Sequence, residues 1–228
     1  MFLVLACSTQ QSFSQTTILN FDFGSLDSGD GDLMVSNGFV QTGDDGDINN
    51  SGDQTTEISF VGPLDPMFAD IPGGASISFS GLELNTDATT LDLGNNVSVI
   101  SGTTTGGQFS LFDDDDMLLL QGDVGDFSIS NLEGSGTGNF VSVGNTTFTA
   151  GSLLPLINPN SGLISLSLIQ IETNGQPGFE VIDGTIQPFI ADASGQISAA
   201  IVPEPTSLPV LIMGFTLLAS YRNRRSAC

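Results

Sequence analysis

Apolar and polar residues alternate along most of the chain between residues 16 and 201. In the first such run, apolar Leu19, Phe21 and Phe23 are separated by single polar residues. Similar short runs recur around residues 77–84, 97–99, 109–111, 117–120, 127–129, 140–143 and 164–171. A period of two places one side of an extended strand in the core, and the intervening Gly, Asn, Asp and Pro favour turns. The pattern therefore predicts about ten short strands.

These strands predict an all-β fold. No stretch of ten or more residues before the C-terminal tail shows a helical stripe, and no internal repeat indicates a solenoid or propeller. We expect an antiparallel β-sandwich or jelly roll, with a barrel as a further arrangement. A β-rich extracellular domain is predicted over residues 15–194, with a linker over 195–202. Within the domain, a turn is predicted at Ser101-Gly102.

The C-terminal tail has the features of a membrane anchor. It begins with Pro203, Glu204 and Pro205, and residues 205–221 carry no charge. As a helix this span would reach about 25 Å, close to the thickness of the hydrocarbon core. All cationic side chains of the protein follow it, namely Arg222, Arg224 and Arg225. The positive-inside rule places these arginines in the cytoplasm, so the tail predicts a single transmembrane helix in the precursor.

This order of a Pro-Glu-Pro motif, a short apolar span and an arginine cluster resembles the PEP-CTERM sorting signal of Gram-negative and related bacteria. The resemblance is confined to residues 203–228. It implies that an exosortase, a membrane-embedded transpeptidase similar to cysteine proteases, recognises the tail and cleaves it near the motif. It also implies an association with exopolysaccharide production and biofilm or floc formation. The alternative is a plain C-terminal anchor that is never cut.

The N-terminus resembles a secretory signal peptide, which we predict over residues 1–14. Residues 2–7 are apolar, and Ser12 and Ser14 provide small side chains at the −3 and −1 positions of a cleavage site. The apolar stretch is shorter than usual and no cation precedes it, so the signal is expected to begin upstream of Met1. Two alternatives remain open: a lipoprotein box with an acylated Cys7, and a buried N-terminal strand.

Charge excludes two classes of partner. The chain has 26 acidic residues and three basic ones, with no His, and a cut near Pro203 would remove only Glu204 from the acidic set. Such a surface repels nucleic acid and anionic membranes, because phosphate binding depends on Lys and Arg. The 16 Phe and the high content of other apolar residues predict a folded core rather than an acidic disordered chain.

The side-chain inventory also limits the chemistry. Residues 15–202 contain no His, Lys, Arg, Cys or Tyr. A Ser-His-Asp triad, a Schiff-base lysine and a histidine metal site therefore cannot be assembled within this segment. A pair of carboxylates, as in glycoside hydrolases, is the remaining catalytic option. The chain has no Trp to hold a sugar, so the sequence predicts a protein that is not an enzyme and leaves the glycoside hydrolase as a remote alternative.

Carboxylates could instead bind calcium, which takes six to eight oxygen ligands. No nearby cation neutralises the acidic clusters, and recruited ions would relieve their repulsion. None of the clusters is an EF-hand, because a loop beginning at Asp45 has Asn50 where Gly is required and Thr56 at its last position. The alternative is that these are solvated acidic turns. The candidate calcium ligands are Asp27, Asp30 and Asp32; Asp44, Asp45, Asp47 and Asp53; and Asp113, Asp114, Asp115 and Asp116, the last four at the predicted tip of a hairpin.

These features predict an exported, non-catalytic protein of the cell surface or extracellular matrix. Its expected partners are an exosortase-type processing enzyme, the membrane before processing, and exopolysaccharide. The alternative function is a calcium-dependent carbohydrate-binding or adhesive module.

Overall fold

The computed structural model describes residues 15–23, 33–36, 38–43, 55–61, 74–85, 87–95, 97–142 and 146–202. The predicted signal peptide and the predicted sorting tail lie outside these residues. So do the acidic clusters of residues 27–32 and 44–53.

Strands dominate the described residues, which contain no α-helix. This confirms the predicted all-β class. The elements are β1 (Thr16–Phe23), β2 (Leu33–Ser36), β3 (Phe39–Thr42), β4 (Thr56–Phe60), β5 (Gly74–Ser80), β6 (Leu82–Leu84), β7 (Thr89–Gly94), β8 (Val97–Thr105), β9 (Gln108–Asp113), β10 (Leu118–Asp123), β11 (Phe127–Leu132), β12 (Gly138–Ser142), β13 (Thr147–Ala150), the 3-10 turn η2 (Leu154–Leu156), β14 (Leu163–Thr173), β15 (Gln176–Pro177), β16 (Val181–Ile182), β17 (Thr185–Ile186) and β18 (Ile190–Ala199).

The core of the molecule is a closed antiparallel barrel. Strand β18 pairs with β2, and the order continues through β3, β6, β8, β11, β12 and β14. The ring closes because β14 pairs back with β18. Closure removes the free sheet edges that the two separate sheets of a sandwich or jelly roll would retain. The strand pairing is therefore that of a barrel, and not that of the sandwich or jelly roll that the sequence pattern favours.

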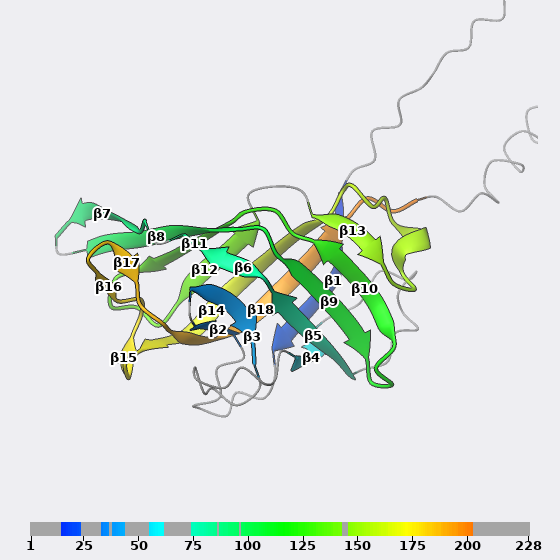
Figure 1. Cartoon of the computed structure of the whole chain (residues 1–228), viewed down its shortest axis with the longest axis horizontal. Coiled ribbons are helices and arrows are strands. Elements are labelled where there is room, and N and C mark those ends of the chain that lie inside the picture. The colour runs from blue at the N-terminus through cyan, green and yellow to red at the C-terminus, as the bar shows by residue number, and fades with distance from the viewer. Residues whose placement is uncertain are drawn as a thin grey trace, which may run out of the picture.

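A second set of strands branches from β18. Its C-terminal half pairs with β1, and the sheet continues through β4, β5, β9, β10 and β13. Figure 1 shows β5, β9 and β10 in front of β1 and β18, so this branch forms a second layer. The layer is tied to the barrel where the Phe79 backbone N–H donates to Thr42 Oγ1 over 3.0 Å.

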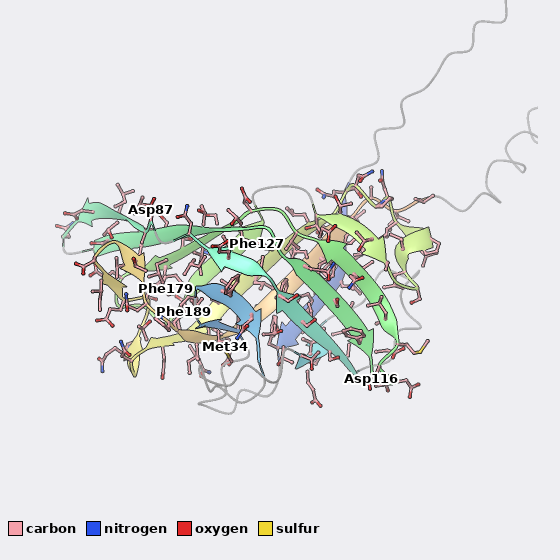
Figure 2. The ribbon with its side chains drawn as sticks, viewed as in Figure 1. Met34, Asp87, Asp116, Phe127, Phe179 and Phe189 are labelled. Carbon is pink, nitrogen blue, oxygen red and sulfur yellow. The ribbon has the colours of Figure 1, made fainter. Side chains whose placement is uncertain are left out.

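Phenylalanines fill the space between the layers. Phe21, Phe79 and Phe109 are fully buried, and the rings of Phe79 and Phe109 have centroids 6.3 Å apart. Phe109 also packs edge-on against Phe148 at 6.1 Å. Phe127 lies near the middle of the molecule (Figure 2). One continuous apolar core of this kind stabilises the described fold without a disulfide.

The segment predicted as a linker over residues 195–202 belongs to the barrel domain. Residues 195–199 form the end of β18, which is paired on both sides. Beyond it, Ile201 bridges to Ile157, and the Val202 N–H donates to the Leu156 carbonyl over 2.9 Å. The described domain therefore extends to the residue before Pro203.

The turn predicted at Ser101-Gly102 is absent, because β8 runs through both residues. Gly102 faces the core, where a Cβ would lie 2.9 Å from Ile186 Cδ1. The glycine marks close packing in the middle of a strand rather than a turn.

Candidate functional site: a neutral polar face on the barrel

A row of polar side chains crosses the outside of the barrel in perfect register. Each member lies directly opposite the next on the neighbouring strand, and none is buried. Strands β1, β18, β14, β12, β11 and β8 carry most of the row and succeed one another in the sheet (Figure 1). The polar row consists of Ser59, Asp22, Ser194, Ser167, Asn139, Ser130, Ser101 and Thr89.

A second row runs beside the first, two residues further along each strand. Successive odd or even positions of a strand share a face, so both rows point away from the core. Gln196 pairs with both Asn20 and Ser165, and Ser128 pairs with Thr103. Val141 of β12 continues this row, because it pairs with Ser165 on one side and with Ser128 on the other.

The face formed by these rows carries almost no charge. Asp22 is its single carboxylate, although the chain as a whole has 26 acidic residues. The other described acids lie outside the two rows: some are in turns, as Asp114 and Asp183 are, and Asp192 on β18 is buried. A solvated surface of an acidic protein has no need to keep carboxylates away from one face. The centres of binding surfaces, in contrast, are depleted in charged residues. The face is therefore a candidate site for an uncharged ligand.

Two hollows deepen this face and meet at one residue. The first has a volume of about 390 Å³ and the second about 470 Å³, and Ser167 lines both. In the first hollow, short Ser165, Ser167 and Ser194 lie among longer side chains, which explains the depression. Its remaining lining residues are Asn20, Phe21, Asp22, Val61, Gly195 and Gln196.

The second hollow lies where the sheet is interrupted. Strand β12 begins at Gly138, which pairs with Asn131 of β11 and Leu168 of β14, and the hollow lies at this end of the strand. Aliphatic Val99, Leu132 and Ile169 line this part of the hollow, and polar Ser130 and Asn139 line the part that adjoins Ser167. The joined hollows thus offer hydrogen-bonding groups along their length and an apolar wall at one end.

A third hollow of about 480 Å³ lies at the end of the barrel that carries β15 and β16. Glu133 and Glu180 line it, and the Asn174 side-chain amide donates to Glu180 over 2.7 Å. Buried Phe179 also lines it and packs against Phe189 with centroids 4.5 Å apart (Figure 2). Glu133 and Glu180 are the pair of carboxylates that the remote glycoside hydrolase alternative would use in this hollow.

The predicted acidic hairpin is present and is built by one of its own carboxylates. Asp113 Oδ1 accepts the backbone N–H groups of Asp115, over 3.0 Å, and of Met117, over 2.8 Å. Asp114, Asp115 and Asp116 are exposed, and Asp116 lies at the outer end of the hairpin (Figure 2). Among the described residues, no group of three or more acidic side chains is arranged to hold a metal ion. Calcium binding stays a prediction for all three clusters, and the other two lie outside the described residues.

One acidic side chain near the polar face is buried. Asp192 is 6% exposed and pairs with Ile169, two residues before Ser194 on β18. Strand β14 occupies one edge of β18, and the other edge is shared by β1, where Asp22 pairs with Ser194, and β2, where Leu33 pairs with Ala191. The segment that joins β1 to β2 contains the predicted ligands Asp27, Asp30 and Asp32.

Neither the polar face nor its hollows were predicted from the sequence. A signal did exist, because Ser165 and Ser167 alternate with buried leucine and isoleucine in a chain whose polar residues are so often acidic. The predicted sorting motif, Pro203 to Pro205, lies outside the described residues, as do the three arginines of the tail. No helix within the described ranges has the length and apolar character needed to cross a membrane.

Comparison with protein-family models, with curated proteins and with solved structures finds no match to this chain.

Proposed function

We propose that this protein is an exported, non-catalytic component of the cell surface or extracellular matrix, delivered as a membrane-anchored precursor and cleaved at its tail by an exosortase-type enzyme. The observation that carries the proposal is the order of features at the C-terminus. The Pro203-Glu204-Pro205 motif, the uncharged span and the arginine cluster follow directly after Val202.

The structure of the domain is compatible with cleavage at that place. Val202 is held to Leu156 by a backbone hydrogen bond, and the strand pairings described for the barrel lie within residues 16–199. Removing the residues from Pro203 onward leaves every one of these pairings in place. Processing would therefore release a complete barrel rather than a truncated one.

The side-chain chemistry supports a role that is not catalytic. Residues 15–202 contain no histidine, lysine, cysteine or arginine to act as a nucleophile, base or anion clamp. What the domain does present is an outer face of hydroxyl and amide groups. Such groups suit binding within a matrix.

Intact-mass analysis of the protein isolated from its producing cells tests the processing step. We expect a mass that lacks the residues from about Pro203 onward, and we expect replacement of all three motif residues by Ala to leave the full tail attached. A native protein that still carries residues 208–228 would overturn the proposal.

The alternative is a calcium-dependent carbohydrate-binding or adhesive module, and the joined hollows on the polar face favour carbohydrate binding. A glycan array probed in calcium and in chelator separates the two functions. A matrix component gives either no signal or a signal that chelator leaves unchanged, whereas the calcium-dependent module gives a signal that chelator removes.

A further inference from the structure

We propose that the joined hollows bind one extended chain of a neutral polysaccharide, which crosses the strands from β1 to β8. This inference deepens the proposed function and rests on it, since a matrix component needs a surface that contacts the matrix polymer. It assigns that contact to the polar face and names the chemistry of the ligand.

The lining groups match a ligand with many hydroxyls. The hydroxyl of Ser167 and the amides of Asn139 and Gln196 each donate and accept hydrogen bonds, as sugar hydroxyls do. Aliphatic Val61 in the first hollow and Ile169 in the second can cover the apolar faces of sugar rings. The arrangement therefore provides both contacts that a saccharide offers, without an aromatic platform.

Charge selects a neutral polymer over an anionic one. The chain has a net charge of −23, and its three cations all lie in the sorting tail. A polyuronate or another polyanion would meet long-range repulsion and no cationic side chain on this face. The near absence of carboxylates along the rows leaves the short-range contacts to uncharged groups. A second copy of this chain is disfavoured as the occupant for the same reason, because both copies would carry the same large charge.

The geometry favours a polymer over a single sugar. Neighbouring strands lie about 4.8 Å apart, so a row with one polar group per strand repeats at that interval. From β1 to β8 the row crosses six neighbouring strands, and its length along the curved outer surface is about 24 Å. The two hollows meet at Ser167 along this direction. An extended chain with regularly repeated hydroxyls is the ligand that uses the whole length.

Affinity electrophoresis of the full chain tests the proposal. The gels contain neutral glucans, mannans or galactans in one series and alginate, a polyanion, in the other. We expect at least one neutral polymer to retard the protein and alginate not to. The Ser167→Trp variant places a bulky side chain on the exposed outer face, where both hollows meet, and should weaken binding by about tenfold or more.

Two further sets of variants control for folding. Thr147→Trp places the same side chain at an exposed position on β13, away from the face, and should bind like the wild type. Asn139→Ala and Gln196→Ala remove lining amides without adding bulk, and each should weaken binding. Far-ultraviolet circular dichroism confirms that each variant is folded.

Several results would overturn the inference. They are retardation by no neutral polymer, equal binding by wild type and Ser167→Trp, binding of alginate alone, and binding that chelator abolishes while the fold persists. Self-association that Ser167→Trp prevents would assign the face to a second copy instead. Failure of the proposed function is seen separately, because intact mass reports tail processing in the wild type whether or not any polymer binds.

Discussion

At the scale of single residues, Gly195 makes room for large side chains on the two strands that pair with β18. Gly195 of β18 faces the core, where a Cβ would lie 2.5 Å from both Leu166 Cδ2 and Phe21 Cζ. Both neighbours are fully or almost fully buried and cannot move aside without disturbing the core. Packing therefore requires a glycine at this position, although the sequence predicts a linker there.

We predict that Gly195→Ala lowers the free energy of unfolding by about 1–3 kcal/mol, the usual cost of overpacking a core. Urea denaturation of the two proteins measures the difference. Gly136→Ala is the matched control, since its Cβ would meet no atom closer than 3.9 Å and should change stability little. Equal stability of wild type and Gly195→Ala would show that Phe21 and Leu166 can shift to accept a methyl group at this position.

At the scale of elements, the β9–β10 hairpin depends on the side chain that begins its turn. Asp113 accepts two backbone N–H groups of the turn, and Asp116 adopts a positive φ of 59°. Asn offers the same carbonyl oxygen as acceptor but carries no charge. The pair of substitutions Asp113→Ala and Asp113→Asn therefore separates turn formation from charge.

Asp113→Ala should lower stability by about 1 kcal/mol through the loss of these bonds, and Asp113→Asn should keep most of it. Thermal or urea unfolding of both variants measures this. If this hairpin instead binds calcium, Asp113→Asn should remove a calcium-dependent gain in stability that the wild type shows. Equal effects of the two substitutions on stability would contradict the turn-forming role.

Alternation predicted the elements that have one buried and one exposed side, such as β1, β5, β11 and β14. It failed for β18, whose small residues and Gly195 resemble a linker, because pairing with strands on both sides is not visible in the local sequence. The polar face could not be predicted for a similar reason. Its rows depend on the register of many strands, and a shift of one residue in any strand would turn its polar side chains inward.

At the scale of the whole molecule, the acidic side chains far outnumber the cationic side chains that could balance their charge. The described residues hold no cationic side chain, so none of their carboxylates can form an ion pair with a described partner. Repulsion among the acids opposes the compact state, and dissolved salt screens it. Raising sodium chloride should therefore raise the melting temperature even if no ion is bound at a specific site.

Specific calcium binding must exceed this screening effect. An ion that binds only the folded state adds about 2.7 kcal/mol at a concentration of 100 times its Kd, and this raises the melting temperature by about 5–10 °C for a domain of this size. The measurement is thermal unfolding of residues 15–202 in chelator, in millimolar calcium, and in magnesium or sodium at the same ionic strength. The calcium hypothesis predicts that the melting temperature rises in calcium and not in magnesium or sodium. If the Asp113→Asn variant shows the same rise, the calcium binds at the clusters of residues 27–32 or 44–53. Equal melting temperatures in the three salts would identify the clusters as solvated turns, and any polysaccharide binding would then depend on the uncharged side chains of the polar face.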